Sequence, residues 1–216
     1  MPLAETEENK SFAVGHLALG YISSKASAKL LKTELNIPLI LTLSILPDID
    51  ILIPFLTHRG PTHSVLVAFV VFLPLFAVFR KKAVPYFLAL LQHSLISDYI
   101  AGGQIQLLWP VTIQQYGMGI GIKSQTNMAI EWIAFLAATI VMFKAKDLAV
   151  LFQPHNSNLI LTIPTFTVLL PTFLSFPLDV PQWLILPHLI YLSIFSASII
   201  IDISQALKGI SFSRIP

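Results

Sequence analysis

The sequence contains no cysteine, and only 11% of its 216 residues are charged. Without cysteine the chain cannot form disulfide frameworks, thiolate metal sites, redox dithiols or cysteine nucleophiles. Thirteen lysines and arginines stand against eleven aspartates and glutamates, so the sequence offers no strongly basic surface for nucleic acid. These absences exclude a disulfide-rich scaffold and predict that nucleic acid is not a partner.

Long hydrophobic runs, in contrast, are abundant. Hydrophobic residues make up 55% of the chain, and a bilayer crossing needs about 20 consecutive, mostly apolar residues. A short run at residues 12–22 precedes six longer ones, so the predicted fold is an all-α transmembrane helical bundle of six to seven membrane helices in a lipid bilayer. The longer runs lie at residues 37–56, 64–79, 83–101, 127–143, 159–176 and 182–201.

Basic residues predict the orientation of this bundle. Cytoplasmic loops of membrane proteins carry an excess of lysine and arginine, and ten of the thirteen basic residues fall on alternate loops. We therefore expect a multi-pass protein of the plasma or inner membrane with a cytoplasmic C-terminus. The ten residues are Lys25, Lys29, Lys32, Arg80, Lys81, Lys82, Lys144, Lys146, Lys208 and Arg214.

Ionisable side chains are concentrated inside these runs and in the turn that follows the first long one. Each costs about 2.5 kcal/mol or more to insert into a bilayer and usually has a function. Measured from the nearest cytoplasmic basic residue at 1.5 Å per helical residue, depths run from ~14 Å for His16 to ~25 Å for His63. These side chains can therefore share one layer between mid-membrane and the outer interface. The set comprises His16, Asp48, Asp50, His58, Arg59, His63, His93, Asp98 and Glu131.

Two local patterns bear on how these side chains could meet. Pro47 ends or restarts a helix, so Asp48 and Asp50 lie on irregular backbone, where residues two apart can converge. His93 and Asp98 are five residues apart, about 140° out of register on a regular helix. A bulge or an unwound turn near Asp98 is therefore needed for both to face one ion.

The electrostatics of this layer favour a metal ion. Buried carboxylates must be neutralised or paired, and Arg59 alone cannot balance four of them. A divalent cation would balance them and also accept neutral imidazoles; without sulfur ligands, zinc is the first candidate, with manganese and iron as alternatives. The predicted metal ligands are His16, Asp48, His58, His63, His93 and Asp98. The predicted catalytic residues are Asp50, Arg59 and Glu131.

Several segments of the chain resemble one known family. They are His16–Gly20, Leu46–Asp50, His58–Ser64, and His93–Asp98 followed by Leu107–Pro110. Through them the chain resembles the LexA-binding, inner-membrane-associated, metal-dependent hydrolase family of bacteria and archaea, although Ala101 and Gln104 stand where that family has Thr and Gly. The resemblance implies a helical, membrane-embedded hydrolase that needs a metal. A more distant likeness, to zinc phospholipase C and its nuclease relatives, implies phosphoester substrates.

The predicted function is hydrolysis of a phosphoester or lipid-like substrate at the outer side of the membrane. A bound metal would lower the pKa of a water molecule, Asp50 or Glu131 would take the proton, and Arg59 would hold a phosphate or a developing oxyanion. The rival hypothesis is an ion or small-solute transporter or channel, because polar residues on broken helices also line transport pathways. One domain, residues 1–216, is expected, with the site in residues 12–131 and no role assigned to residues 148–216.

Overall fold

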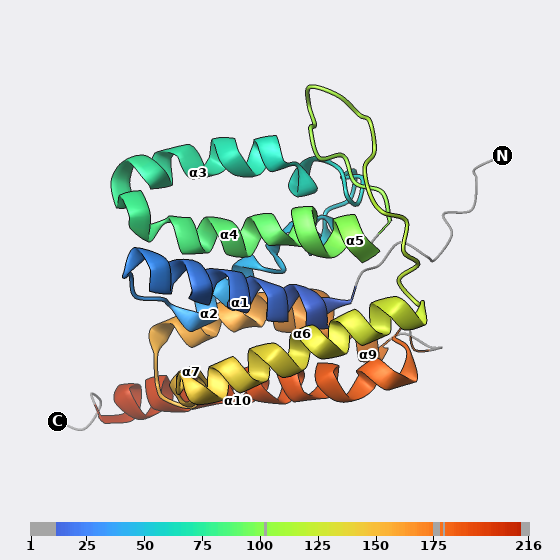
Figure 1. The fold of residues 1–216 in the computed structure, drawn as a ribbon. Coiled ribbons are helices and arrows are strands. Elements are labelled where there is room, and N and C mark those ends of the chain that lie inside the picture. Colours follow the sequence, from blue (N-terminus) through green and yellow to red (C-terminus); the bar gives the residue numbers. More distant parts are fainter. Residues whose placement is uncertain (1–11, 102, 175–177, 179, 213–216) are drawn as a thin grey trace.

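The computed structural model describes residues 12–101, 103–174, 178 and 180–212 (Figure 1). Within these ranges every regular element is helical, so the predicted all-α class is confirmed. Phe176, at the end of the fifth predicted run, and Arg214 lie outside the described residues.

Five longer helices and the seven-residue α2 form the body of the described part of the molecule. They are α1 (Ala13–Leu31), α2 (Ile37–Leu43), α3 (Val65–Phe79), α4 (Val84–Gln92), α6 (Gln125–Lys144) and α10 (Gln182–Phe212). α1 occupies the middle of the bundle, packed between α4 and α6, while α3 borders α4 and α10 borders α6 (Figure 1). Because of this central place α1 is buried over most of its length, including polar His16.

Shorter helical pieces connect the long helices. The 3-10 helices are η2 (Leu46–Leu52), η3 (Pro61–His63), η4 (Arg80–Lys82) and η6 (Asn156–Leu161); the π-helices are η5 (His93–Asp98) and η7 (Thr165–Leu169). The short α-helices are α5 (Tyr99–Ala101), α7 (Asp147–Leu151), α8 (Thr162–Pro164) and α9 (Leu170–Leu174). Side chains of Asn36, Ser64 and Ser124 accept hydrogen bonds from backbone N–H groups in the first turns of α2, α3 and α6, and thereby fix where these helices begin.

The number of helices able to cross a membrane differs from the prediction. By length and composition, three helical segments among the described residues qualify, so six to seven spans are not supported. The 37–56 run contains only the seven-residue α2 before Pro47 turns the chain into η2, and α3 has 15 residues. Polar residues interrupt the 83–101 run, and lysines occupy the second half of α1. The qualifying segments are Gln125–Lys144, Asn156–Leu174 and Gln182–Lys208.

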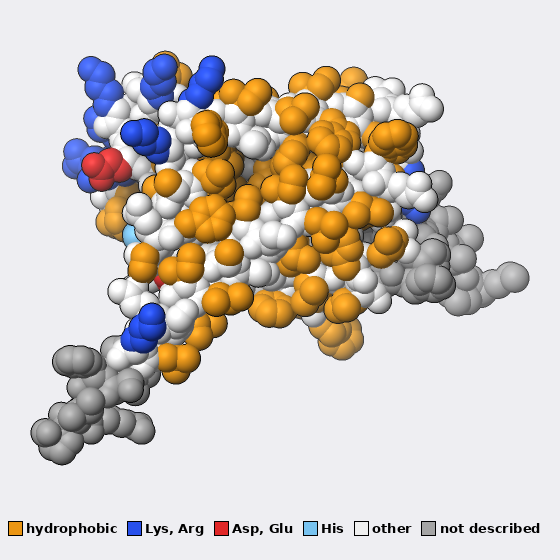
Figure 2. Space-filling view, turned by 90° about the horizontal axis from the view of Figure 1, so that it is seen from below, with side chains coloured by type: hydrophobic (Ala, Val, Ile, Leu, Met, Phe, Trp, Pro, Cys, Tyr) orange, Lys and Arg blue, Asp and Glu red, His pale blue; other side chains and the backbone are white. Residues whose placement is uncertain are grey.

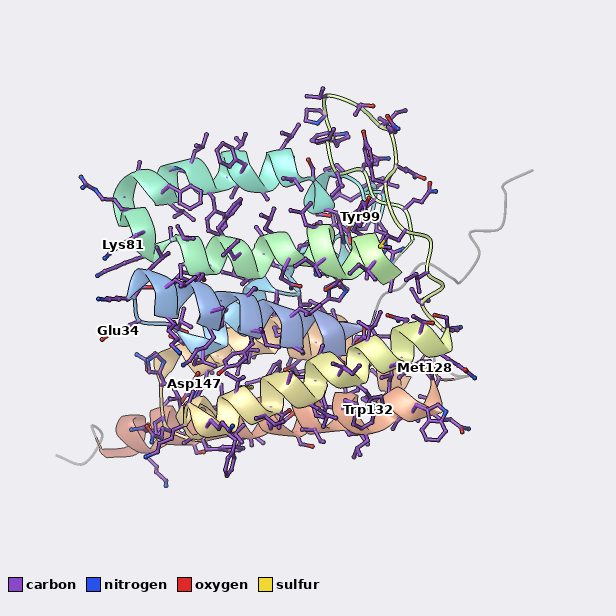
Figure 3. All side chains as sticks on the ribbon, viewed as in Figure 1. Glu34, Lys81, Tyr99, Met128, Trp132 and Asp147 are labelled. Atoms are coloured by element: carbon purple, nitrogen blue, oxygen red, sulfur yellow. The ribbon has the colours of Figure 1, made fainter. Side chains whose placement is uncertain are left out.

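The two ends of the bundle differ in charge. Glu34, Lys81 and Asp147 lie at one end, and Tyr99 and Met128 lie at the other (Figure 3). Seen from below, the molecule shows a largely hydrophobic surface with lysine and arginine side chains gathered mainly at one end (Figure 2). We call the end that carries Lys81 the lysine-rich end.

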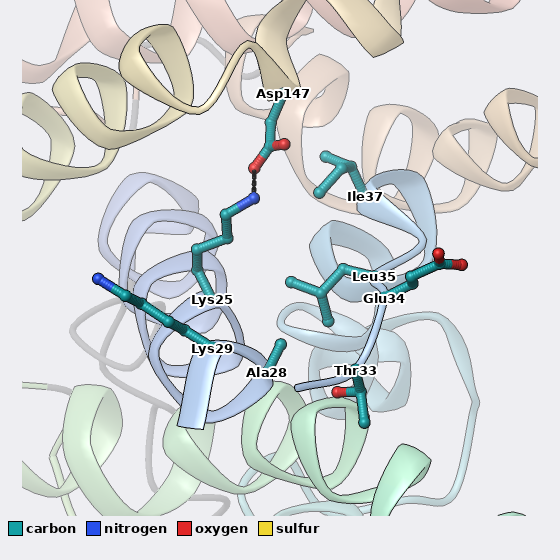
Figure 4. A pocket seen from close by; sticks show the side chains of 8 residues that line it. All are labelled: Lys25, Ala28, Lys29, Thr33, Glu34, Leu35, Ile37 and Asp147. Carbon is teal, nitrogen blue, oxygen red and sulfur yellow. Dashed lines mark hydrogen bonds and ion pairs between the residues drawn. The ribbon is translucent and has the colours of Figure 1, made fainter. Parts of the chain in front are cut away.

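A cavity of about 470 Å³ opens at the lysine-rich end. Lys25 forms an ion pair with Asp147 there (Figure 4), and the Tyr21 hydroxyl donates a 2.7 Å hydrogen bond to the same carboxylate. The cavity is lined by none of the predicted metal-ligand or catalytic residues. The candidate site therefore lies elsewhere, beside the half of α1 that contains His16.

Candidate metal centre

Two breaks in regular helix bring four of the six predicted ligands to one place, whereas, among the described residues, His58 lies in a second group with Asp50 and His16 lies in neither group. Pro47 lies in the first turn of the 3-10 helix η2, in which both Asp48 and Asp50 are buried. The chain between His93 and Asp98 forms the π-helix η5, whose i to i+5 hydrogen bonds place residues five apart on the same side. The predicted break at Pro47 and the predicted bulge before Asp98 are both confirmed.

Four buried side chains form the centre of the site, and we call Asp48, His63, His93 and Asp98 the four-ligand cluster. Each offers one ligand atom, and these atoms all lie within 4.8 Å of one another. Asp48 Oδ1 lies 3.4 Å from His63 Nε2 and 3.2 Å from His93 Nε2. Asp98 Oδ2 lies 3.2 Å and 3.5 Å from the same two nitrogens, which are 3.2 Å apart.

These separations are those that a tetrahedral zinc ion requires. Bonds of about 2.0–2.1 Å from zinc to nitrogen or oxygen place neighbouring ligand atoms about 3.3 Å apart. Five of the six separations among the four atoms range from 3.2 to 3.5 Å, and the sixth, between the two carboxylate oxygens, is within 4.8 Å. The residues present therefore fit a divalent cation in both chemistry and spacing.

The carboxylate oxygens of the four-ligand cluster point to the same conclusion. Asp48 Oδ1 and both side-chain oxygens of Asp98 are buried and accept no hydrogen bond from the described residues. A buried, unsatisfied polar group costs about 1–3 kcal/mol, and more when it is charged. A cation bound among these oxygens would remove this cost.

A hydrogen bond behind the four-ligand cluster sets the orientation of the His93 imidazole. His93 Nδ1 lies 2.8 Å from the Ser44 carbonyl oxygen. Because a carbonyl only accepts, this nitrogen carries the hydrogen and Nε2 presents a lone pair to the cluster. Gly20 permits this arrangement, since a Cβ there would lie 2.2 Å from Ser44 Cβ.

Asp50 holds His63 from behind rather than joining the four-ligand cluster. Its Oδ2 lies 3.3 Å from His63 Nδ1 and accepts hydrogen bonds from the Thr62 hydroxyl and the Arg59 backbone N–H. Its Oδ1 lies 2.9 Å from His58 Nδ1. A carboxylate behind a histidine ligand is a common arrangement at metal sites, although Asp50, His58 and His63 also form a second group that can hold an ion.

The turn that carries His63 lies outside the three candidate membrane spans. Burial alone would lower the pKa of His63, but its contacts with the carboxylates of Asp48, Asp50 and Asp98 outweigh burial and hold that pKa well above its ordinary value. In the absence of a cation a proton is therefore attracted to the place where a metal would bind. A metal ion has to displace this proton, so binding releases it.

His16 and Glu131 lie beside the four-ligand cluster. The His16 ring stacks on His93 with centroids 3.8 Å apart, and its Nε2 lies 3.5 Å from Asp98 Oδ1. Glu131 accepts a hydrogen bond from the backbone N–H of Gly15, in the first turn of α1, where a Cβ would lie 2.7 Å from the carboxylate. Among the described residues, Glu131 belongs to neither of the two side-chain groups that can hold a metal ion.

Arg59 is the only arginine or lysine among the predicted site residues, and it is buried. Its side chain is 4% exposed, and Nη2 lies 3.8 Å from Asp98 Oδ1. Nε, Nη1 and Nη2 have no hydrogen-bond partner among the described residues. The guanidinium therefore lies at the edge of the four-ligand cluster with its N–H donors unmatched.

Comparison with known proteins places the chain in a family. A sequence profile of the YdjM inner membrane protein family matches residues 12–178. The chain belongs to the YdjM inner membrane protein family. The matched range includes every predicted site residue, from His16 to Glu131, and supports the predicted membrane location. No curated protein and no solved structure matches the chain.

Sequence reasoning missed the groups that orient the histidines of this YdjM-family chain. The Ser44 carbonyl and the Thr62 hydroxyl contact His93 and His63, and Gln92 Nε2 donates a 3.0 Å hydrogen bond to the His16 carbonyl. A backbone carbonyl gives no signal in residue types. For Thr62 the available signal was its position beside His63 in the His58–Ser64 segment.

Proposed function

We propose that this YdjM-family protein is a membrane-bound, metal-dependent hydrolase. The observation that carries the proposal is the close approach of four buried ligand atoms, from Asp48, His63, His93 and Asp98, with five of their six separations at 3.2–3.5 Å. His16 lies close enough to Asp98 to serve as a further ligand. Zinc suits this donor set, and manganese and iron also accept imidazole and carboxylate ligands.

The roles of the other predicted residues follow from their contacts. A bound divalent cation supplies an acidified water molecule and polarises the group to be cleaved. Asp50 is engaged by Arg59, Thr62 and His58, which makes it a positioning residue for His63. Glu131 is then the carboxylate outside the ligand set that we propose as proton acceptor.

We propose a phosphoester or lipid-like substrate that reaches the site from the extracytoplasmic side. Tyr99, which follows Asp98, lies at the end of the bundle opposite Lys81 (Figure 3), and cytoplasmic loops are typically rich in lysine and arginine. Exposed apolar side chains, including those of Leu52 and Phe55, connect Asp50 with His58. An amphiphile in the outer leaflet would meet these apolar side chains beside the four-ligand cluster.

The proposed orientation predicts opposite accessibility for Lys81 and Lys123. Both side chains are exposed, and the sequence contains no cysteine, so single-cysteine variants need no background removal. We expect a membrane-impermeant maleimide to label Lys123→Cys in intact cells and Lys81→Cys only after the membrane is opened. Labelling of both variants from the same side would contradict the orientation.

Reversible metal removal tests the hydrolase proposal. We expect about one equivalent of zinc, manganese or iron by elemental analysis of the purified protein. We also expect cleavage of at least one of three substrates: p-nitrophenyl phosphate, bis(p-nitrophenyl) phosphate or phosphatidic acid. A chelator should abolish this cleavage, and re-addition of the same metal should restore it.

Two results would count against the hydrolase. Less than one tenth of an equivalent of any transition metal, even after reloading, would remove the metal from the proposal. Metal-loaded protein that cleaves none of these substrates but carries ions across reconstituted vesicles would favour the transporter or channel, whose pathway would use the same buried polar cluster.

A further inference from the structure

The chain fixes Arg59 in place through its backbone. Arg59 adopts a left-handed conformation with φ of 63°, which a non-glycine residue rarely takes. Its N–H donates to Asp50 Oδ2, and its carbonyl oxygen accepts a 3.0 Å hydrogen bond from the Gln106 N–H. Gly60 follows, and a Cβ there would lie 2.8 Å from the Thr57 carbonyl oxygen. The position of Arg59 beside the four-ligand cluster is therefore imposed by the turn.

The guanidinium offers more hydrogen bonds than the protein uses. Arginine presents five N–H donors in a planar fork that matches two oxygens of an oxyanion. In Arg59 all three nitrogens are buried without a hydrogen-bond partner among the described residues. The nearest carboxylate oxygen, Asp98 Oδ1, is 3.8 Å from Nη2, beyond hydrogen-bond distance.

We infer that Arg59 binds an oxyanion of the substrate in the ground state, and that the reacting group is therefore a phosphoryl group. The inference rests on the proposed function, because it needs a cation at the four-ligand cluster. A carboxylic ester or amide is neutral before it reacts and has one carbonyl oxygen. A phosphomonoester or phosphodiester is already an anion and has at least two non-bridging oxygens, one for the cation and one for Arg59.

Phosphate binding to the full-length protein tests this role directly. The protein is placed in nanodiscs and loaded with Mn²⁺, and its metal content is measured. Inorganic phosphate is then titrated while its ³¹P resonance is followed, because a bound paramagnetic ion broadens the signal of a phosphate held beside it. We expect saturable broadening in the wild-type protein. For Arg59→Gln we expect a Kd at least tenfold higher at equal metal content.

Two further variants separate the guanidinium from general charge. Arg59→Lys should fall between wild type and Arg59→Gln, because an ammonium keeps the charge but lacks the fork. Lys123→Gln removes an exposed lysine outside the cluster and should bind phosphate as wild type does. If Arg59→Gln does not fold, the comparison of Arg59→Lys with Lys123→Gln decides the question.

The outcomes distinguish this inference from the hydrolase proposal. Failure to hold any metal overturns both. A full equivalent of metal without phosphate binding, or phosphate binding unchanged in the folded Arg59 variants, overturns the inference alone. If phosphatidic acid in the nanodisc displaces inorganic phosphate and diacylglycerol does not, the oxyanion comes from a lipid headgroup; if neither displaces it, the phosphoryl substrate is soluble.

Discussion

A His93→Gln variant should lose its metal ion and keep its fold. In the wild-type protein His93 Nε2 lies between Asp48 Oδ1, Asp98 Oδ2 and His63 Nε2, at 3.2, 3.5 and 3.2 Å. Glutamine has no imidazole lone pair: its amide nitrogen does not coordinate a metal, and its amide oxygen is a weaker ligand for zinc than an imidazole nitrogen. We expect metal affinity to fall by more than about 100-fold, the upper end of the range for losing a residue behind a ligand.

Two measurements check this expectation. Elemental analysis should give about one equivalent of metal in wild type and under one tenth in His93→Gln. Zinc should also raise the melting temperature of the wild type alone, because an ion at 100 times its Kd stabilises the folded state by about 2.7 kcal/mol. The second measurement separates a lost ion from a damaged fold.

A matched control is available in the same chain. His155 is exposed, and its Nδ1 accepts a hydrogen bond from the Ser157 N–H. It belongs to neither of the two side-chain groups that can hold a metal ion. His155→Gln should keep both the metal and the zinc-dependent rise in melting temperature. If His93→Gln also kept both, the four-ligand cluster would not be where the ion binds.

The four-ligand cluster could be predicted because its cause is electrostatic and is visible in residue types. Asp48 and Asp98 in apolar runs need a cation, and helical rise places His63 and His93 in the same layer, between mid-membrane and the outer interface. The five-residue spacing from His93 to Asp98 even required a wider helical turn, which the π-helix η5 provides. These inferences use only composition and spacing, both of which the sequence states completely.

The number of spans could not be predicted in the same way. A hydropathy run counts apolar residues, but it does not say whether their backbone continues as one helix. The α-helical part of the 37–56 run is the seven-residue α2, and Pro47 and the two aspartates after it lie in the 3-10 helix η2. The same limit applies to Glu131, whose partner is the backbone N–H of Gly15, 116 residues away in sequence and without a signature in residue type.

An Asp50→Asn variant should bind the metal ion more weakly without losing it. Asparagine keeps the size of the side chain and can still accept from the Arg59 N–H or the Thr62 hydroxyl. It removes the charge that faces His63 Nδ1 at 3.3 Å and His58 Nδ1 at 2.9 Å. Loss of a carboxylate behind a histidine ligand typically costs 10–100-fold in metal affinity, and we expect a loss in this range by competition with a chromophoric chelator.

Stoichiometry distinguishes this role from the alternative that Asp50, His58 and His63 hold an ion of their own. If Asp50 only positions His63, wild type and Asp50→Asn both bind one ion and differ in affinity. If Asp50 is a ligand, the wild type binds two ions and the variant binds one. The affinity for the ion that the variant still binds would then be little changed. Asp147→Asn is the control, because Asp147 is also a hydrogen-bonded, largely buried carboxylate but lies at the lysine-rich end with Tyr21 and Lys25. Asp147→Asn should change neither the number of bound ions nor the metal affinity, since no ligand of the four-ligand cluster contacts Asp147.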